Sequence, residues 1–122
     1  MESNLIYKQL IALKQNATAC HIDDRDKFLI MSDLHIGDGG PLDDAAQNEA
    51  LILATLQEFY LSRGFQLVLN GDVEELFKHP LKRIRQRWKD LYTVFGKFAS
   101  RTALFKLVGN HDFDLLRKKN SN

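Results

Sequence analysis

Three short polar clusters hold the side chains of this sequence that are best suited to chemistry. They are Asp33-Leu34-His35, Gly71-Asp72 and Gly109-Asn110-His111. Carboxylates, an amide oxygen and imidazoles are suitable ligands for divalent ions such as Mn²⁺, Fe²⁺ or Zn²⁺, and no cluster contains a thiolate. The clusters therefore predict a metal site, provided that the fold brings them together.

A short apolar run precedes each cluster and predicts a buried β-strand. These runs cover residues 28–31, 65–69 and 103–108. Strands that are apolar almost throughout are typical of parallel sheets. The segments between the runs are long enough for helices, and an order of strand, helix, strand, helix, strand indicates βαβ units.

Local signals define the helices between these strands. Asp43 or Asp44 can cap a helix that runs to about residue 63, where Gly64 is a natural stop. Pro80 suits the entry of a second helix over residues 81–99, because the first helical position needs no N–H. We therefore expect an α/β fold with three parallel βαβ-linked strands and flanking helices, preceded by an N-terminal helix.

The carboxyl ends of parallel strands meet at one edge of a sheet, where the ligand sites of open α/β sheets lie. Asp72 follows Asp33 after almost the same interval as Asn110 follows Asp72. A carboxylate on the middle strand could bridge two cations that its neighbours also bind. Two divalent ions about 3.5–4 Å apart can acidify a bridging water and hold both ends of a phosphoryl displacement.

The three clusters resemble the first three signature blocks of the calcineurin-like metallophosphoesterases. The matching residues are Asp33-x-His35, then Gly71-Asp72-x-x-Glu75, then Gly109-Asn110-His111-Asp112. The resemblance covers about residues 28–113. Each block alone is a weak signal, but three blocks in order at the ends of predicted strands are specific.

This resemblance implies a metal-dependent phosphoester hydrolase, either a phosphomonoesterase or a phosphodiesterase, that uses a metal-activated hydroxide. Two divalent ions (Mn²⁺, Fe²⁺ or Zn²⁺) would be its cofactors. Asp33 and His35 would hold the first ion, Asp72 would bridge both, and Asn110 would bind the second. The substrate would be a phosphate ester of unknown identity.

The resemblance also assigns roles beside the metals. His111 would lie next to the phosphate and protonate the leaving group or stabilise the transition state. Asp112 would hydrogen-bond His111 and fix its tautomer. Glu75 stands where the family often has an acidic residue, without an assigned role.

The sequence departs from the family pattern after the third block. The family supplies further histidines from later blocks, whereas no histidine follows Asp112 here. The family fold is a two-sheet sandwich of about twice this length. We therefore expect residues 1–122 to form a single, incomplete metallophosphoesterase domain that could be inactive alone. The alternative is a scaffold or interaction protein that has the same fold but no turnover.

Two motifs have a second interpretation. Asn70-Gly71 is a strong hairpin signal, although residues 73–77 lack the alternation of a returning strand. A basic stretch between Lys78 and Lys89 is interleaved with Ile84 and Trp88. Its favoured interpretation is a solvated helix face whose apolar residues pack on the sheet, and the alternative is a positive rim that attracts anionic partners.

Composition limits the function classes. The 122 residues are 44% hydrophobic and 27% charged, with 17 lysines and arginines against 16 aspartates and glutamates. This balance does not indicate nucleic acid as a partner, although nucleic acid could be a substrate. The single cysteine, the absence of a signal-peptide pattern and the lack of a membrane span predict a cytoplasmic protein. Half of a two-sheet sandwich would leave one sheet face and an edge strand uncovered, which predicts self-association.

Overall fold

The computed structural model describes residues 2–117, and its sheet has three parallel strands. These are β1 (Phe28–Met31), β2 (Gln66–Asn70) and β3 (Leu104–Leu107), in the order β1-β2-β3. The predicted mixed α/β fold with three parallel strands is confirmed. The hairpin alternative at Asn70-Gly71 is wrong, because β2 pairs in parallel with both of its neighbours.

A continuous helical segment connects β1 to β2. It comprises η1 (Ala46–Asn48), α2 (Glu49–Ala54), the π-helical η2 (Thr55–Tyr60) and η3 (Leu61–Arg63). Gly64 ends it with a φ of 75°, as expected of a glycine after a helix. The predicted cap is wrong, since no side chain caps η1; Asp43 instead accepts the N–H groups of Gly39 and Ala45.

Two helices, rather than the predicted single one, connect β2 to β3. They are α3 (Leu81–Arg87) and α4 (Lys89–Arg101). Trp88 separates them with φ and ψ of −102° and 26°. Its buried indole N–H donates to Asp43 Oδ2 at 3.0 Å. This anchor to the preceding crossover explains why the helix departs from regular geometry here.

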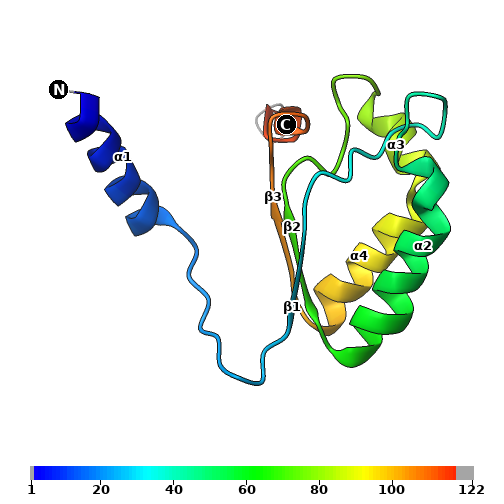
Figure 1. Cartoon of the computed structure of the whole chain (residues 1–122), viewed down its shortest axis with the longest axis horizontal. Coiled ribbons are helices and arrows are strands. Elements are labelled where there is room, and N and C mark those ends of the chain that lie inside the picture. Colours follow the sequence, from blue (N-terminus) through cyan, green and yellow to red (C-terminus); the bar gives the residue numbers. More distant parts are fainter. Residues whose placement is uncertain (1, 118–122) are drawn as a thin grey trace.

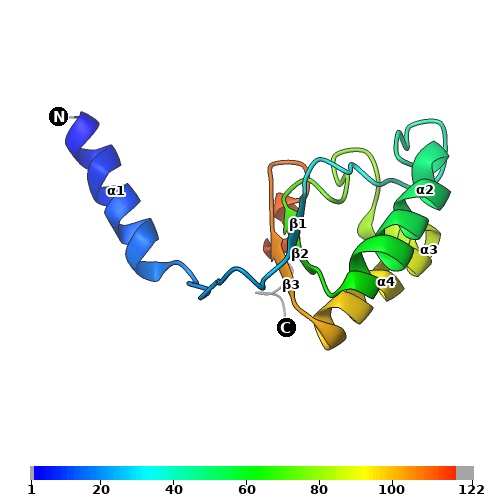
Figure 2. The same ribbon diagram turned by 60° about the horizontal axis from the view of Figure 1, so that its bottom comes forward.

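The helices α2, α3 and α4 all lie on one face of the sheet (Figures 1 and 2). Leu67 and Leu69 of β2 face them and are fully buried. The core also contains the apolar residues of the helices, Leu56, Ile84, Trp88, Leu91, Val94, Phe95 and Phe98. The predicted packing of the apolar residues of 81–99 on the sheet is confirmed.

The opposite face of the sheet is uncovered among residues 2–117. Ile30, Val68 and Phe105 are in register across the three strands and alternate with the helix-facing residues. Ile30 is 66% exposed. The second sheet that the family resemblance implies is not among the described elements, so the metallophosphoesterase sandwich is not confirmed.

The predicted N-terminal helix is present as α1 (Glu2–Asn16). It stands away from the sheet in both views (Figures 1 and 2), and the described side chains from Ser3 to Lys27 are exposed. None of the helices described is long and apolar enough to cross a membrane.

Candidate metal centre

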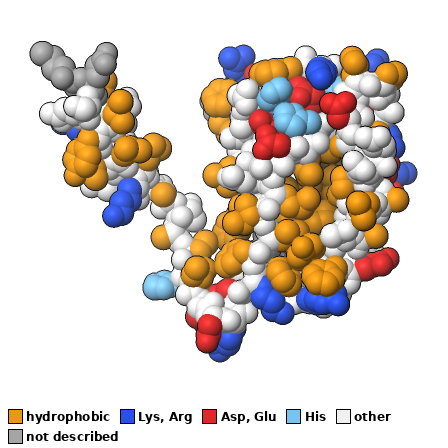
Figure 3. Space-filling model, viewed as in Figure 1, with side chains coloured by type: hydrophobic (Ala, Val, Ile, Leu, Met, Phe, Trp, Pro, Cys, Tyr) orange, Lys and Arg blue, Asp and Glu red, His pale blue; other side chains and the backbone are white. Residues whose placement is uncertain are grey.

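The loops that follow the three strands are hydrogen-bonded to one another at the carboxyl edge of the sheet. Asp33 N–H donates to the carbonyl of Gly71 at 3.2 Å, and His35 N–H donates to the carbonyl of Asp72 at 3.0 Å. The third loop joins through the N–H of Leu76, which donates to the carbonyl of His111 at 3.0 Å. Acidic and histidine side chains gather at this end of the molecule (Figure 3).

Three residues here have a left-handed backbone. Asp33, His35 and Asp72 have φ values of 55°, 48° and 53°, and they are the only non-glycine residues with positive φ between residues 2 and 117. This conformation is uncommon for residues with a Cβ atom and clusters at functional sites. All three are residues that the sequence analysis selected as metal ligands.

The same three side chains converge. Ligand atoms of Asp33, His35 and Asp72 lie within 4.8 Å of one another, and His35 Nε2 is 3.5 Å from Asp33 Oδ1. Two ligands that each lie about 2.1 Å from one ion are roughly 3–3.5 Å apart. The 3.5 Å spacing of the Asp33 and His35 atoms and the mixture of two carboxylates with one imidazole therefore suit a divalent ion.

Asp72 is held in place by the third loop. Its Oδ1 accepts the N–H of His111 at 2.9 Å. Gly109 lies directly against it: a Cβ atom on this glycine would come within 2.1 Å of Asp72 Oδ1 and 3.0 Å of Asp72 N. Gly109 therefore lacks a side chain because the Asp72 carboxylate occupies that space.

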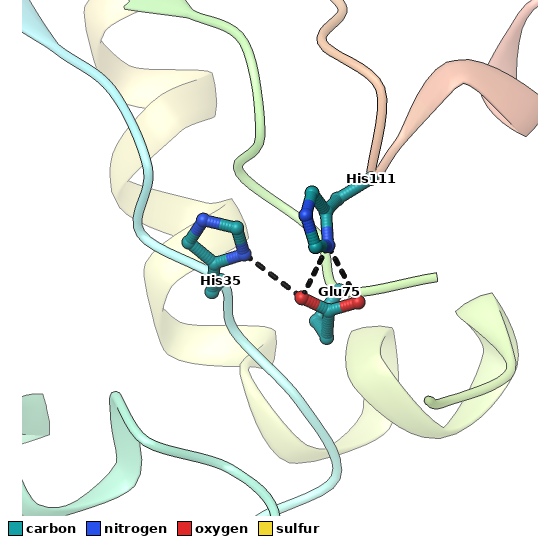
Figure 4. A group of neighbouring side chains, drawn as sticks. All are labelled: His35, Glu75 and His111. Atoms are coloured by element: carbon teal, nitrogen blue, oxygen red, sulfur yellow. Dashed lines mark hydrogen bonds and ion pairs between the residues drawn. The ribbon is translucent and has the colours of Figure 1, made fainter. Parts of the chain in front are cut away.

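Glu75 connects the two site histidines (Figure 4). Its buried carboxylate lies 2.8 Å from His35 Nδ1 and 2.7 Å from His111 Nδ1. The two rings meet edge to face with centroids 4.6 Å apart. His35, Glu75 and His111 could themselves hold an ion, but contacts of 2.7–2.8 Å are hydrogen-bond lengths. We therefore interpret Glu75 as the group that orients both rings and leaves their Nε2 atoms for ligands.

The ionisation of these groups follows from their contacts. Burial acts to lower the pKa of His35, but the carboxylates of Glu75, Asp33 and Asp72 together outweigh it, so the pKa is raised. Burial likewise acts to raise the pKa of Glu75, but His111 and His35 lower it overall. A hydrogen bond from Ser32, followed by contact with His35, lowers the pKa of the exposed Asp33 carboxyl. Both carboxylates are therefore stabilised in their charged forms.

Asp112 does not have the predicted partner. Its Oδ1 accepts the N–H of Gly109 at 2.6 Å, and its Oδ2 accepts the N–H of Val73 at 2.9 Å. Its side chain is completely buried. The prediction that Asp112 fixes the tautomer of His111 is wrong, because both of its oxygens bind backbone amides and Glu75 contacts the imidazole instead. Asp112 joins the second and third loops.

Replacing Asp112 with asparagine should lower the free energy of unfolding. An amide has one oxygen, so one of the two buried N–H groups would face an NH₂ group, at a cost of about 1–3 kcal/mol. Urea unfolding monitored by circular dichroism measures this change. The control, Asp114→Asn, alters a largely exposed carboxylate and should change stability by less than about 0.5 kcal/mol. Equal stability of the two variants would contradict the structural role of Asp112.

The remaining predicted ligand, Asn110, lies at this edge but is exposed. Within residues 2–117 its side chain makes no hydrogen bond to another residue. The three residues predicted to hold the first ion are therefore brought together. Of the two predicted for the second ion, only Asp72 belongs to a converged group among the described residues. The structure gathers one of the two predicted metal sites more completely than the other.

Sequence reasoning missed two features of this edge. Glu75 was noted only as an acidic position, although it contacts both histidines. His79, which is 95% buried, has its Nδ1 3.4 Å from Asp38 Oδ1 and lies against Gly37. The sequence feature that could have indicated the contacts of Glu75 is its position three residues after Asp72. No pattern around His79 indicated that its side chain is buried.

Comparison of the chain with protein-family models, with curated proteins and with solved structures gives no match.

Proposed function

We propose that this protein is a metal-dependent phosphoester hydrolase of the calcineurin-like type that its motifs resemble. The proposal is carried by Asp33, His35 and Asp72, whose side chains converge and whose backbones have the same uncommon conformation. Their ligand atoms lie within 4.8 Å of one another, and each residue has a left-handed backbone. Strained backbone at converging ligands is expected where a metal-binding geometry outweighs local conformational preference.

Asp33, His35 and Asp72 would hold the first divalent ion, and Asp72 with Asn110 would hold the second. When bound, the ions would supply an acidified water and positive charge opposite the phosphate. Oxygen and imidazole ligands favour Mn²⁺, Fe²⁺ or Zn²⁺ over Ca²⁺. The hydrogen bond from His111 N–H to Asp72 Oδ1 leaves Oδ2 of that carboxylate for coordination.

His111 is the proposed proton donor to the leaving group. Its Nδ1 lies 2.7 Å from the Glu75 carboxylate, so Nε2 is the nitrogen that can face a substrate oxygen. Glu75 would hold the ring in this orientation. This arrangement gives Glu75 the positioning role that the resemblance had assigned to Asp112.

In a preparation that turns over substrate, His111→Ala should lower kcat by about a hundredfold or more. Metal content should change little, because the imidazole acts on the leaving group. Steady-state kinetics with metal analysis of the same sample measures both quantities. Loss of metal with a normal rate per occupied site would contradict this role.

Hydrolysis of bis-p-nitrophenyl phosphate in excess Mn²⁺ tests the proposal. We expect little turnover, because two protein ligands would hold the second ion weakly. Any turnover above background should be abolished by EDTA and absent from Asp72→Ala. The alternative is a scaffold on the same fold. Tight metal binding without turnover above background would favour that alternative.

We further expect the chain to bind about one metal ion tightly, since only the first site has three converged protein ligands. It should also self-associate through the uncovered sheet face, where Ile30 and Leu107 are 66% and 51% exposed. Light scattering combined with metal analysis measures both properties. A monomer that carries two tightly bound ions would contradict both expectations.

A further inference from the structure

Phe77 stands beside the proposed proton donor at the carboxyl edge of the sheet. Its ring centroid is 4.5 Å from that of His111, with 39° between the ring planes. The side chain is 66% exposed, so most of the ring is available to another molecule. Exposed phenylalanines are not unusual in themselves. The unusual feature of Phe77 is an exposed aromatic ring in contact with a histidine of the candidate site.

The backbone fixes this position. Phe77 follows Leu76, whose N–H donates to the carbonyl of His111 at 3.0 Å. Two residues before Phe77, the Glu75 carboxylate holds the His111 ring from its Nδ1 side. Phe77 and the His111 ring are therefore tied to each other through both the main chain and a side chain.

The predicted metal ligands and Glu75 are polar, unlike Phe77. The side chains of Asp33, His35, Asp72 and Glu75 would serve the phosphate and its ions, and none of them is a hydrocarbon side chain. A substrate has a second part, the alcohol that leaves when its oxygen accepts a proton. Because His111 would give that proton, the alcohol must lie next to His111, where the exposed ring of Phe77 also lies.

We propose that Phe77 is a specificity-determining residue that receives an aromatic ring on the leaving group of the substrate. Aromatic rings gain from stacked or edge-to-face contact beyond the burial of their area, whereas a small aliphatic alcohol gains little. The substrate class would then be phosphoesters whose alcohol carries an aromatic ring close to the ester oxygen. This inference rests on the proposed function, because the position of the alcohol follows from the proposed donation of a proton by His111.

Binding of two phosphonates to the Mn²⁺-loaded protein tests the inference without requiring turnover. Phenylphosphonate and methylphosphonate share the phosphonate group and differ in the ring. By isothermal titration, we expect the wild type to bind phenylphosphonate roughly three- to tenfold more tightly than methylphosphonate. In Phe77→Ala this ratio should fall to near one, with the affinity for methylphosphonate unchanged.

The control variant is Phe59→Ala, which removes another exposed phenylalanine. Phe59 lies in η2 beside Tyr60, whose carbonyl accepts the N–H of Phe65 just before β2 begins, whereas the site histidines follow the ends of strands. It should keep the wild-type ratio. Equal affinity of the wild type for the two phosphonates would overturn the role of Phe77 and leave the proposed function standing. Equal weakening of both ligands in Phe77→Ala would also overturn it, since Phe77 would then only support the His111 ring. Failure of both ligands to bind the wild type would overturn the proposed function, and this inference with it.

Discussion

Asp72→Ala is expected to weaken Mn²⁺ binding more than any other single substitution at the site. Its carboxylate belongs to the converged group with Asp33 and His35, and it is the residue proposed to serve both ions. Removing groups that only orient a ligand typically costs 10- to 100-fold in metal affinity. Loss of a shared ligand should therefore cost about a hundredfold or more.

Isothermal titration of Mn²⁺ into the wild type and Asp72→Ala measures this loss. Asp44→Ala is the matched control, because it removes an exposed aspartate that follows β1 without belonging to the converged group. The control should bind as the wild type does. Wild-type affinity in Asp72→Ala would contradict the assignment of Asp72 as a shared ligand.

Gly109→Ala should have the second largest effect, although it adds only a methyl group. The new Cβ atom would lie 2.1 Å from Asp72 Oδ1 and 3.0 Å from the backbone nitrogen of Asp72. Contacts this short force the carboxylate or the loop to move. We expect metal affinity to fall by roughly 10- to 100-fold, as for other losses of ligand positioning.

Gly96→Ala provides the matched control for this substitution. Gly96 is exposed within α4, and nothing lies within 4 Å of its added Cβ atom. Metal affinity should not change, while the free energy of unfolding should rise by about 0.5–1 kcal/mol, because alanine is the better helix former. Titration and urea unfolding of both variants separate the two effects. Normal metal binding by Gly109→Ala would show that the loop adapts without moving Asp72.

The sequence was sufficient to predict the three strands and the convergence of the clusters that follow them. Apolar runs before Asp33, Asp72 and Asn110 indicated parallel strands, and strands of that kind bring their carboxyl ends to one edge. The parallel arrangement follows from this pattern, because each helical connection is long enough to return the chain to the edge of the sheet where the preceding strand began. The crossover from residue 43 to Gly64 was predicted to within about three residues at its start.

The partners of the site residues could not be predicted from the sequence. Whether Glu75 or Asp112 contacts His111 depends on the path of the chain after Asp72, which has a left-handed backbone. That turn directs Glu75 towards the histidines and leaves Asp112 buried against the N–H groups of Val73 and Gly109. A single backbone conformation of this kind leaves no periodic signal in the sequence.

The break between α3 and α4 at Trp88 could not be predicted from the sequence pattern either. The apolar periodicity of residues 81–99 continues through Trp88, so one helix was the simplest interpretation. The break reflects a tertiary contact, the hydrogen bond from the Trp88 indole to Asp43, which lies 45 residues earlier. Tertiary contacts commonly override helix propensity.

A crystal of the protein soaked in Mn²⁺, with anomalous scattering recorded near the manganese edge, tests the metal assignment most directly. The proposed site predicts that the strongest anomalous peak lies among Asp33, His35 and Asp72, about 2.0–2.3 Å from a carboxylate oxygen of each aspartate and from His35 Nε2. A weaker second peak should lie between Asp72 and Asn110. A strongest peak elsewhere on the chain, or none at this edge in saturating Mn²⁺, would contradict the site and the function proposed for it.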